Sequence, residues 1–168
     1  MESIIKEKLI SIFEKEFNID PNPVGIHFLG KEVRPDFAFY VDNLFLIVEI
    51  KDDTAKNFDL NELLRQSINY RHSLYGKDKR CPDFCFATTT SWLTDYFEAA
   101  DIIQGPVIGL AAKLGVGQII YNSNRKKVKI KLGSKMFATY DPSQMEWEYD
   151  FLDPPSTMIG TKAKSNRI

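Results

Sequence analysis

Residues 36–51, DFAFYVDNLFLIVEIK, decide the fold that this sequence predicts. The segments 36–41 and 44–51 are rich in aromatic and β-branched residues, a composition that favours strands. Asp42 and Asn43 between them are suited to a two-residue hairpin turn. We therefore expect an antiparallel hairpin. Because residues 44–48 are all apolar, the second strand should be buried on both faces of a sheet.

Helices and further strands are expected on both sides of this hairpin. Residues 3–17 and 61–75 carry apolar side chains at helical spacing, and Asp59 and Gly76 are suited to begin and end the second helix. Further segments with a strand-like composition predict short strands at 24–29, 83–88, 117–122 and 127–132. Further segments with a helical pattern predict helices at 92–100 and 106–114.

The order of these elements predicts an α/β or α+β domain built on one central mixed β-sheet flanked by helices. A chain of 168 residues fits one domain, which we place at residues 1–140. Prolines interrupt the chain beyond Tyr140, so an irregular C-terminal extension is expected over residues 141–168. Its last residues are expected to be disordered.

Composition sets few limits on function. Hydrophobic residues make up 43% of the chain and charged residues 27%, as is typical of a globular protein. No apolar run approaches the roughly 18 residues of a membrane span. The N-terminus lacks the pattern of a secretory signal. We therefore expect a cytoplasmic protein that does not associate with membranes.

The charged residues at the ends of the hairpin strands carry the chemistry. Glu49 and Lys51 are two residues apart on one strand, so their side chains share a face. Asp36 opens the preceding strand and can lie opposite. Charged groups on such a buried strand are costly without a partner, and a divalent cation held by two carboxylates would remove that cost.

Magnesium is the cation that these ligands favour, because it prefers hard oxygen atoms and often uses one or two carboxylates. Asp36 and Glu49 are the expected ligands, the backbone carbonyl of Ile50 could add a further oxygen, and manganese should substitute. Lys51 could then orient or deprotonate a water molecule, or stabilise developing negative charge.

The sequence Pro35-Asp36, followed after twelve residues by Glu49-Ile50-Lys51, resembles the signature of the PD-(D/E)XK nuclease superfamily. That family's restriction-endonuclease-like core is a helix, a three-stranded antiparallel meander, a helix and a further strand. The order expected here over residues 3–88 is the same. The resemblance implies metal-dependent hydrolysis of phosphodiester bonds in DNA, with Asp36 and Glu49 as metal ligands and Lys51 as the catalytic lysine.

A finer resemblance concerns the helix after the hairpin. Gln66 and Tyr70 are similar to the QxxxY motif of RecB-like members, and their spacing puts both on one helical face. Residues 31–91 resemble the N-terminal nuclease domain of type I restriction motor subunits. The family often has an acid on its first helix. We choose Glu7 for that role, with Glu2 and Glu14 as competitors.

Basic residues are the expected contacts to DNA. Residues 124–135 hold six basic residues and no acid, although the net charge of the chain is −1. Phosphate contacts are expected from side chains in this stretch and beside the motif: Arg34, Arg125, Lys126, Lys127 and Lys129. Lysines on an edge hairpin can also serve only to prevent edge pairing.

Two classes of function remain open. The complete set of motif residues favours a DNA nuclease, more specifically an endonuclease, that acts alone, as a homodimer or with a partner subunit. The alternative is a catalytically inactive nuclease-fold module that binds nucleic acid or a protein partner. RNA as the substrate and exonuclease action are further possibilities that the residues leave open.

Overall fold

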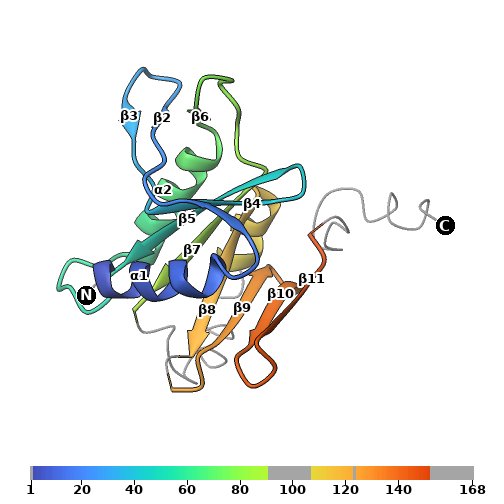
Figure 1. The fold of residues 1–168 in the computed structure, drawn as a ribbon. Coiled ribbons are helices and arrows are strands. Elements are labelled where there is room, and N and C mark those ends of the chain that lie inside the picture. Colours follow the sequence, from blue (N-terminus) through green and yellow to red (C-terminus); the bar gives the residue numbers. More distant parts are fainter. Residues whose placement is uncertain (1, 91–106, 123, 152–168) are drawn as a thin grey trace.

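The computed structural model of the chain describes residues 2–90, 107–122 and 124–151, which form a mixed α/β fold around one large mixed sheet (Figure 1). The sheet has the strand order β1-β4-β5-β7-β8-β9-β10-β11. Its strands are β1 (Asn18–Asp20), β4 (Phe37–Val41), β5 (Leu44–Lys51), β7 (Phe84–Thr89), β8 (Val116–Asn122), β9 (Lys127–Leu132), β10 (Lys135–Asp141) and β11 (Glu146–Tyr149). A smaller sheet has the order β3-β2-β6 and joins β2 (Gly25–Ile26), β3 (Glu32–Val33) and β6 (Leu74–Tyr75).

Strand β5 lies at the centre of the arrangement and separates two hydrophobic clusters. Its residues Leu46, Val48 and Ile50 face the helix α1 (Glu2–Phe13), and all three are fully buried. Phe45 and Ile47 face the helix α2 (Leu60–Arg71) on the other side. The two-residue alternation of a strand therefore assigns the odd-numbered positions, Glu49 and Lys51 among them, to the face that α2 covers.

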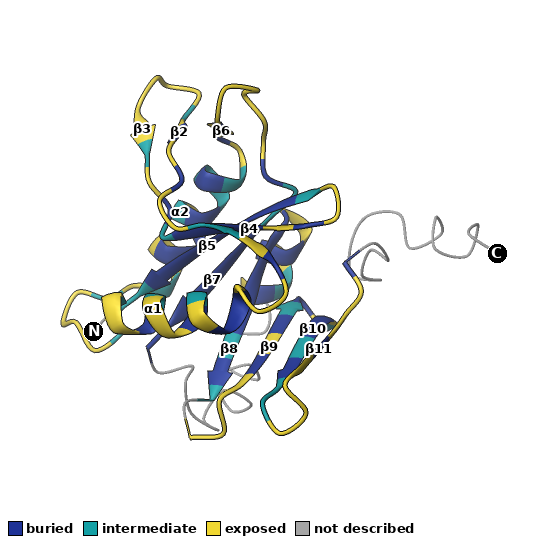
Figure 2. Cartoon of the chain, viewed as in Figure 1, coloured by how far each residue is buried: buried dark blue, intermediate teal, exposed yellow. Residues whose placement is uncertain are grey.

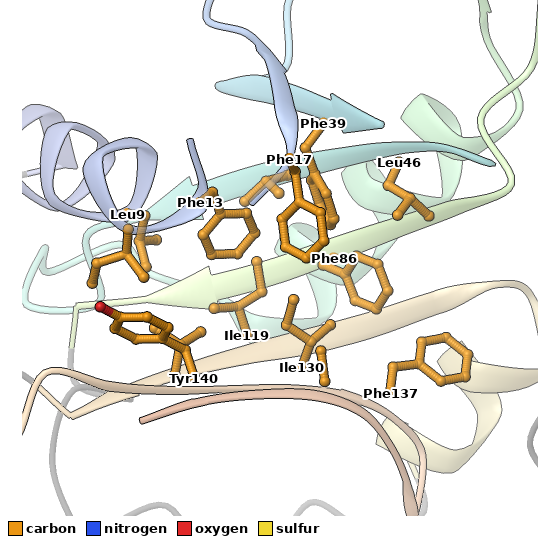
Figure 3. Packing of buried hydrophobic residues seen from close by; sticks show 14 of the residues in the cluster. Leu9, Phe13, Phe17, Phe39, Leu46, Phe86, Ile119, Ile130, Phe137 and Tyr140 are labelled. Carbon is orange, nitrogen blue, oxygen red and sulfur yellow. The ribbon is translucent and has the colours of Figure 1, made fainter. Parts of the chain in front are cut away.

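The cluster beneath α1 is built mainly of aromatic rings. The rings of Phe13 and Phe39 lie 5.0 Å apart in an edge-to-face arrangement, a favoured geometry. Figure 3 shows these side chains with Phe86 and Ile119 between the helix and the sheet. In Figure 2 the strands of the sheet are mostly buried, whereas the outer face of α1 is exposed. The sheet is thus held on this face by a continuous apolar core.

The predicted hairpin is confirmed. Strands β4 and β5 pair antiparallel from Phe37↔Val48 to Val41↔Leu44, and the predicted strands that became β7, β8 and β9 are also present. Asp59 caps α2 by accepting a hydrogen bond from the Asn61 N–H, as expected. Residues 107–113 are helical and precede Gly115, whose φ is +79°. The helix expected at 92–100 lies outside the described residues.

Several expected bounds are wrong. Helix α1 ends at Phe13 rather than at residue 17, and a turn over residues 14–17 leads into β1. The short strand β3 lies before Asp36, outside the strands that the sequence predicts. Helix α2 ends at Arg71, so Gly76 does not end it. The physical reason is that Leu74 and Tyr75 leave the helix to pair with β2, which satisfies their backbone groups better than a further helical turn.

The expectation of irregular structure beyond Tyr140 is wrong for residues 146–149. They form β11, which pairs antiparallel with β10. The Trp147 ring lies 5.1 Å from the Phe13 ring, and its indole N–H donates to the Ile12 carbonyl oxygen over 3.3 Å. Phe151 is also buried in the α1 cluster. The sheet therefore curls around α1, and this aromatic contact outweighs the weak local signal for a strand.

Helices that could cross a membrane are absent from the described part of the chain, since none there is both long enough and apolar enough.

Trp147→Ala should lower the free energy of unfolding by about 3–5 kcal/mol, because it removes a large buried ring from the α1 cluster. Met145→Ala, two residues away but 72% exposed, should change the free energy of unfolding by less than about 0.5 kcal/mol. Urea unfolding of both variants measures the difference. Equal effects would show that β11 is not part of the core.

Candidate active site

Asp36, Glu49 and Lys51 meet where β4 begins and β5 ends. The Asp36 N–H donates to the Val48 carbonyl oxygen over 3.0 Å, which continues the hairpin ladder by one residue. The Asp36 carboxylate in turn accepts a hydrogen bond of 2.7 Å from the Ile50 N–H. Its side chain is thereby held against the end of β5. The structure thus brings together the three residues that the sequence singled out.

Glu49 is only 3% exposed, and its carboxylate lies 2.9 Å from the Lys51 ammonium nitrogen. Burial, together with the nearby Asp36 and against the opposing effect of Lys51, raises the pKa of Glu49 to about 8. Burial also raises the pKa of Asp36, which the hydrogen bond from Ile50 partly offsets. The two acids therefore hold protons more tightly than exposed carboxyl groups do.

Lys51 keeps its positive charge. Burial works to lower its pKa, but the ion pair with Glu49 and the charge of Glu2 outweigh it, so the pKa is raised. A lysine with a raised pKa is a poor general base near neutral pH. The electrostatics of the site therefore favour a charge-stabilising role for Lys51 over proton abstraction.

Gln66 and Tyr70 reach the same site from α2. The Gln66 amide donates to the Tyr70 hydroxyl oxygen over 2.7 Å, so the two side chains lie on one helical face as their spacing predicts. Burial and the charge of Glu49 raise the pKa of Tyr70 to about 12. Tyr70 is therefore a neutral hydroxyl group at physiological pH and can act only as a hydrogen-bonding partner.

The acid that α1 brings to the site is Glu2. Its carboxylate accepts a hydrogen bond of 2.7 Å from the Asp52 N–H, immediately after Lys51, and its charge raises the pKa of Asp36. Glu7, the predicted residue, is exposed, and none of the hydrogen bonds or ion pairs among the described residues joins it to the site. The sequence could not show which of Glu2 and Glu7 reaches the site, because both lie on α1 and the choice depends on how that helix packs against the sheet.

The expected DNA-binding residues lie in two places. Arg34 is exposed and forms an ion pair of 2.6 Å with Glu32. Arg125 and Lys126 are exposed in the turn between β8 and β9. Lys127 and Lys129 are exposed on β9, on the sheet face that also carries Glu49 and Lys51, with β7 and β8 between. Lys127 lies 3.6 Å from the Asp141 carboxylate.

Two buried polar side chains extend the site across the sheet and were missed by the sequence reading. Thr89 pairs in register with Lys51, and Gln118 pairs with Ala87, the neighbour of Glu49. They are 1% and 2% exposed, and within the described residues their side-chain polar atoms have no hydrogen-bond partner. The signal that could have revealed Gln118 is a single amide in the apolar strand run 116–121.

The donor set fits a hard divalent cation. Two carboxylates of raised pKa lie together, and one ammonium group offsets their charge only in part. In a strand, the backbone N–H and C=O groups of one residue point toward the same neighbouring strand. Because the Ile50 N–H donates to Asp36, the Ile50 carbonyl oxygen also points to the side on which Asp36 lies. Among the described residues no group of three or more histidine, cysteine, aspartate or glutamate side chains forms a ready metal cage. Magnesium does not need one, because it retains waters.

Comparisons of this chain with models of known protein families, with curated proteins and with solved structures found no match.

In the presence of a chelator, the free energy of unfolding should fall as the pH rises from about 5 to 8. The folded state binds the Glu49 proton up to a pKa of about 8, whereas the unfolded chain loses it near 4.5, so the unfolded state binds fewer protons across this window. The fall should amount to a few kcal/mol and level off above pH 8.

Glu49→Gln should remove most of this pH dependence, because the amide has no proton to lose. Glu7→Gln, on the exposed side of α1, is the matched control and should keep it. Urea unfolding at several pH values measures all three proteins. A wild-type profile identical to that of Glu49→Gln would contradict the raised pKa of Glu49.

Proposed function

We propose that this chain is a magnesium-dependent nuclease of the PD-(D/E)XK type that hydrolyses phosphodiester bonds in DNA, most simply as an endonuclease. The observation that carries the proposal is the convergence of Asp36, Glu49 and Lys51 at the end of one buried strand. A purely structural role would give no reason to bury Glu49 beside a second, partly buried acid, Asp36, with only one ammonium group between them.

The arrangement of the elements supports a restriction-endonuclease-like core. Helix α1 is followed by β1, β4 and β5, which pair antiparallel in that order. Helix α2 follows, and β7 then pairs parallel with β5. This is the order of the core of the superfamily that the motif resembles. Tyr70 lies near enough to Glu49 and Asp36 for their charges to raise its pKa, and Gln66 donates to it, which supports the resemblance to the QxxxY motif.

Asp36, Glu49 and the Ile50 carbonyl would hold magnesium, with manganese as a substitute. When bound, the cation would polarise the scissile phosphate and lower the pKa of a bound water. Lys51 would place its ammonium charge against the negative charge that develops on the phosphate. The Gln66–Tyr70 pair would orient Lys51 and the substrate through hydrogen bonds. The chain could act alone, as a homodimer or with a partner subunit.

Purified protein should cleave plasmid, linear or single-stranded DNA when magnesium or manganese is added. Asp36→Ala and Lys51→Ala should each reduce the cleavage rate by about 100-fold or more, as is typical when one such stabilising group is removed. Gel assays measure the rate, and circular dichroism confirms that the variants fold. Equal cutting by wild type and variants would reveal a contaminating nuclease, and DNA binding without cleavage would favour the inactive binding module.

Glu2→Gln and Glu7→Gln form a matched pair on α1 that tests which acid belongs to the site. Glu2→Gln should reduce the cleavage rate, because Glu2 fixes the backbone after Lys51 and helps to keep Lys51 charged. Glu7→Gln should cleave like the wild type. The same rate assay decides, and a larger loss in Glu7→Gln would overturn the assignment of Glu2.

A further inference from the structure

The small sheet β2–β3–β6 projects from the rest of the molecule (Figure 1). We call residues 24–34 and 74–80, which contain this sheet and its two turns, the arm. Figure 2 shows that most of it is exposed. Its apolar residues are exposed as well, with Phe28 at 77%, Leu29 at 71% and Ile26 at 56%. A group of exposed apolar side chains on one part of a protein surface is typical of an interaction site.

The tip of the arm is a preformed turn. The His27 N–H donates to the Lys31 carbonyl oxygen and the Gly30 N–H to the His27 carbonyl oxygen, each over 2.8 Å. Gly30 has a φ of +83°, which a residue with a side chain would rarely adopt. The rings of His27 and Phe28 lie 4.0 Å apart. Phe28 and Leu29 are therefore presented at the tip of a closed turn rather than on a loose loop.

The charge of the arm distinguishes between possible partners. It carries five basic residues and only two acids, Glu32 and Asp78, in a chain whose net charge is −1. Arg34 pairs with Glu32, and Arg80 binds Asp83 and the Asn43 carbonyl oxygen. Three exposed lysines remain around the apolar tip and on the neighbouring turn: Lys31, Lys77 and Lys79. An apolar tip with one exposed lysine in its own turn and two on the neighbouring turn complements a polyanion with stacked bases better than it complements an apolar protein surface.

The arm is attached directly to the candidate active site. Strand β3 ends at Val33, three residues before Asp36, and β6 begins at Leu74, four residues after Tyr70. The Tyr75 hydroxyl donates to the Tyr70 carbonyl oxygen over 3.0 Å. A Cβ atom at Gly25 would lie 2.5 Å from the Tyr75 ring, so β2 packs closely on β6 only because residue 25 is glycine. The base of the arm thus adjoins the candidate active site along the chain, while its Tyr75 ring packs on Phe45 at the start of β5.

We propose that the arm binds double-stranded DNA, with Phe28 and Leu29 wedged between base pairs and the three lysines against the phosphates. This inference rests on the proposed function, since it assigns how that site would hold its substrate. An apolar wedge unstacks a base step and bends the duplex, which allows more of the protein to contact it. The basic strand β9, on the sheet face that carries Glu49, could then contact the phosphates further along the same duplex.

The test measures DNA binding with the full chain in a chelator, so that cleavage does not interfere. A labelled duplex reports affinity by fluorescence anisotropy, and 2-aminopurine at successive positions reports unstacking. The double variant Phe28→Ser/Leu29→Ser should bind about tenfold more weakly and lose the unstacking signal. Lys77→Ala/Lys79→Ala should weaken binding to all sequences and reduce the slope of log affinity against log salt by about two.

Met145→Ser is the matched control for the tip, because Met145 is 72% exposed in the turn between β10 and β11, and it should bind like the wild type. Two results would overturn the proposal: the wild type does not bind duplex DNA, or the Phe28→Ser/Leu29→Ser variant binds and unstacks DNA normally. A variant that differs from the wild type only in its oligomeric state, measured by sedimentation, would also overturn it. If the wild type does not cleave DNA but the arm variants lose DNA binding, the arm is a DNA-binding site and the proposed nuclease activity is rejected. If the wild type cleaves DNA and the arm variants bind as the wild type does, the nuclease activity stands and the arm is rejected as a DNA-binding site.

Discussion

The burial of Glu49 beside the partly buried Asp36 and a single lysine is the constraint on which the rest of the structure depends. Glu49 lies on a strand whose other inward-facing residues are apolar, and its pKa of about 8 reflects the cost of placing a charge there. Lys51 compensates only in part. A protein that needed stability alone would replace Glu49 with an apolar residue, because well-packed apolar groups are often as stable as a buried ion pair or more so. The arrangement is therefore better explained by chemistry than by stability.

The fold separates this costly site from the core that supports it. Along β5, even-numbered residues join the aromatic cluster beneath α1, while odd-numbered residues face α2 and end in Glu49 and Lys51. The aromatic cluster draws in α1, β4 and the distant β11, so most of the favourable burial lies on one side of the sheet. The other side can then hold charged groups and polar groups such as Gln118, which has no hydrogen-bond partner among the described residues, without loss of the fold.

The proposed DNA substrate would meet basic residues around the candidate active site. The arm begins and ends within a few residues of Asp36 and Tyr70, and its lysines lie apart from the basic strand β9. The lysines of strand β9 lie on the sheet face that carries Glu49. Positive charge near a carboxylate pair can attract a polyanion toward groups that would otherwise repel it. The net charge of −1 conceals this pattern, because the 23 acidic residues of the chain offset its 22 lysines and arginines in the sum.

The sequence by itself determined the hairpin, the helix that Asp59 caps, the strands that follow it, and the proximity of Asp36, Glu49 and Lys51. These features are local, because strand alternation, turn composition and helix capping act over a few residues. Only the tertiary structure decided that Glu2 rather than Glu7 reaches the site, that Leu74 and Tyr75 leave α2 for β6, and that β11 completes the sheet. Each of these depends on contacts between segments distant in sequence, such as Trp147 with Phe13, whose energy exceeds the local preferences of the chain.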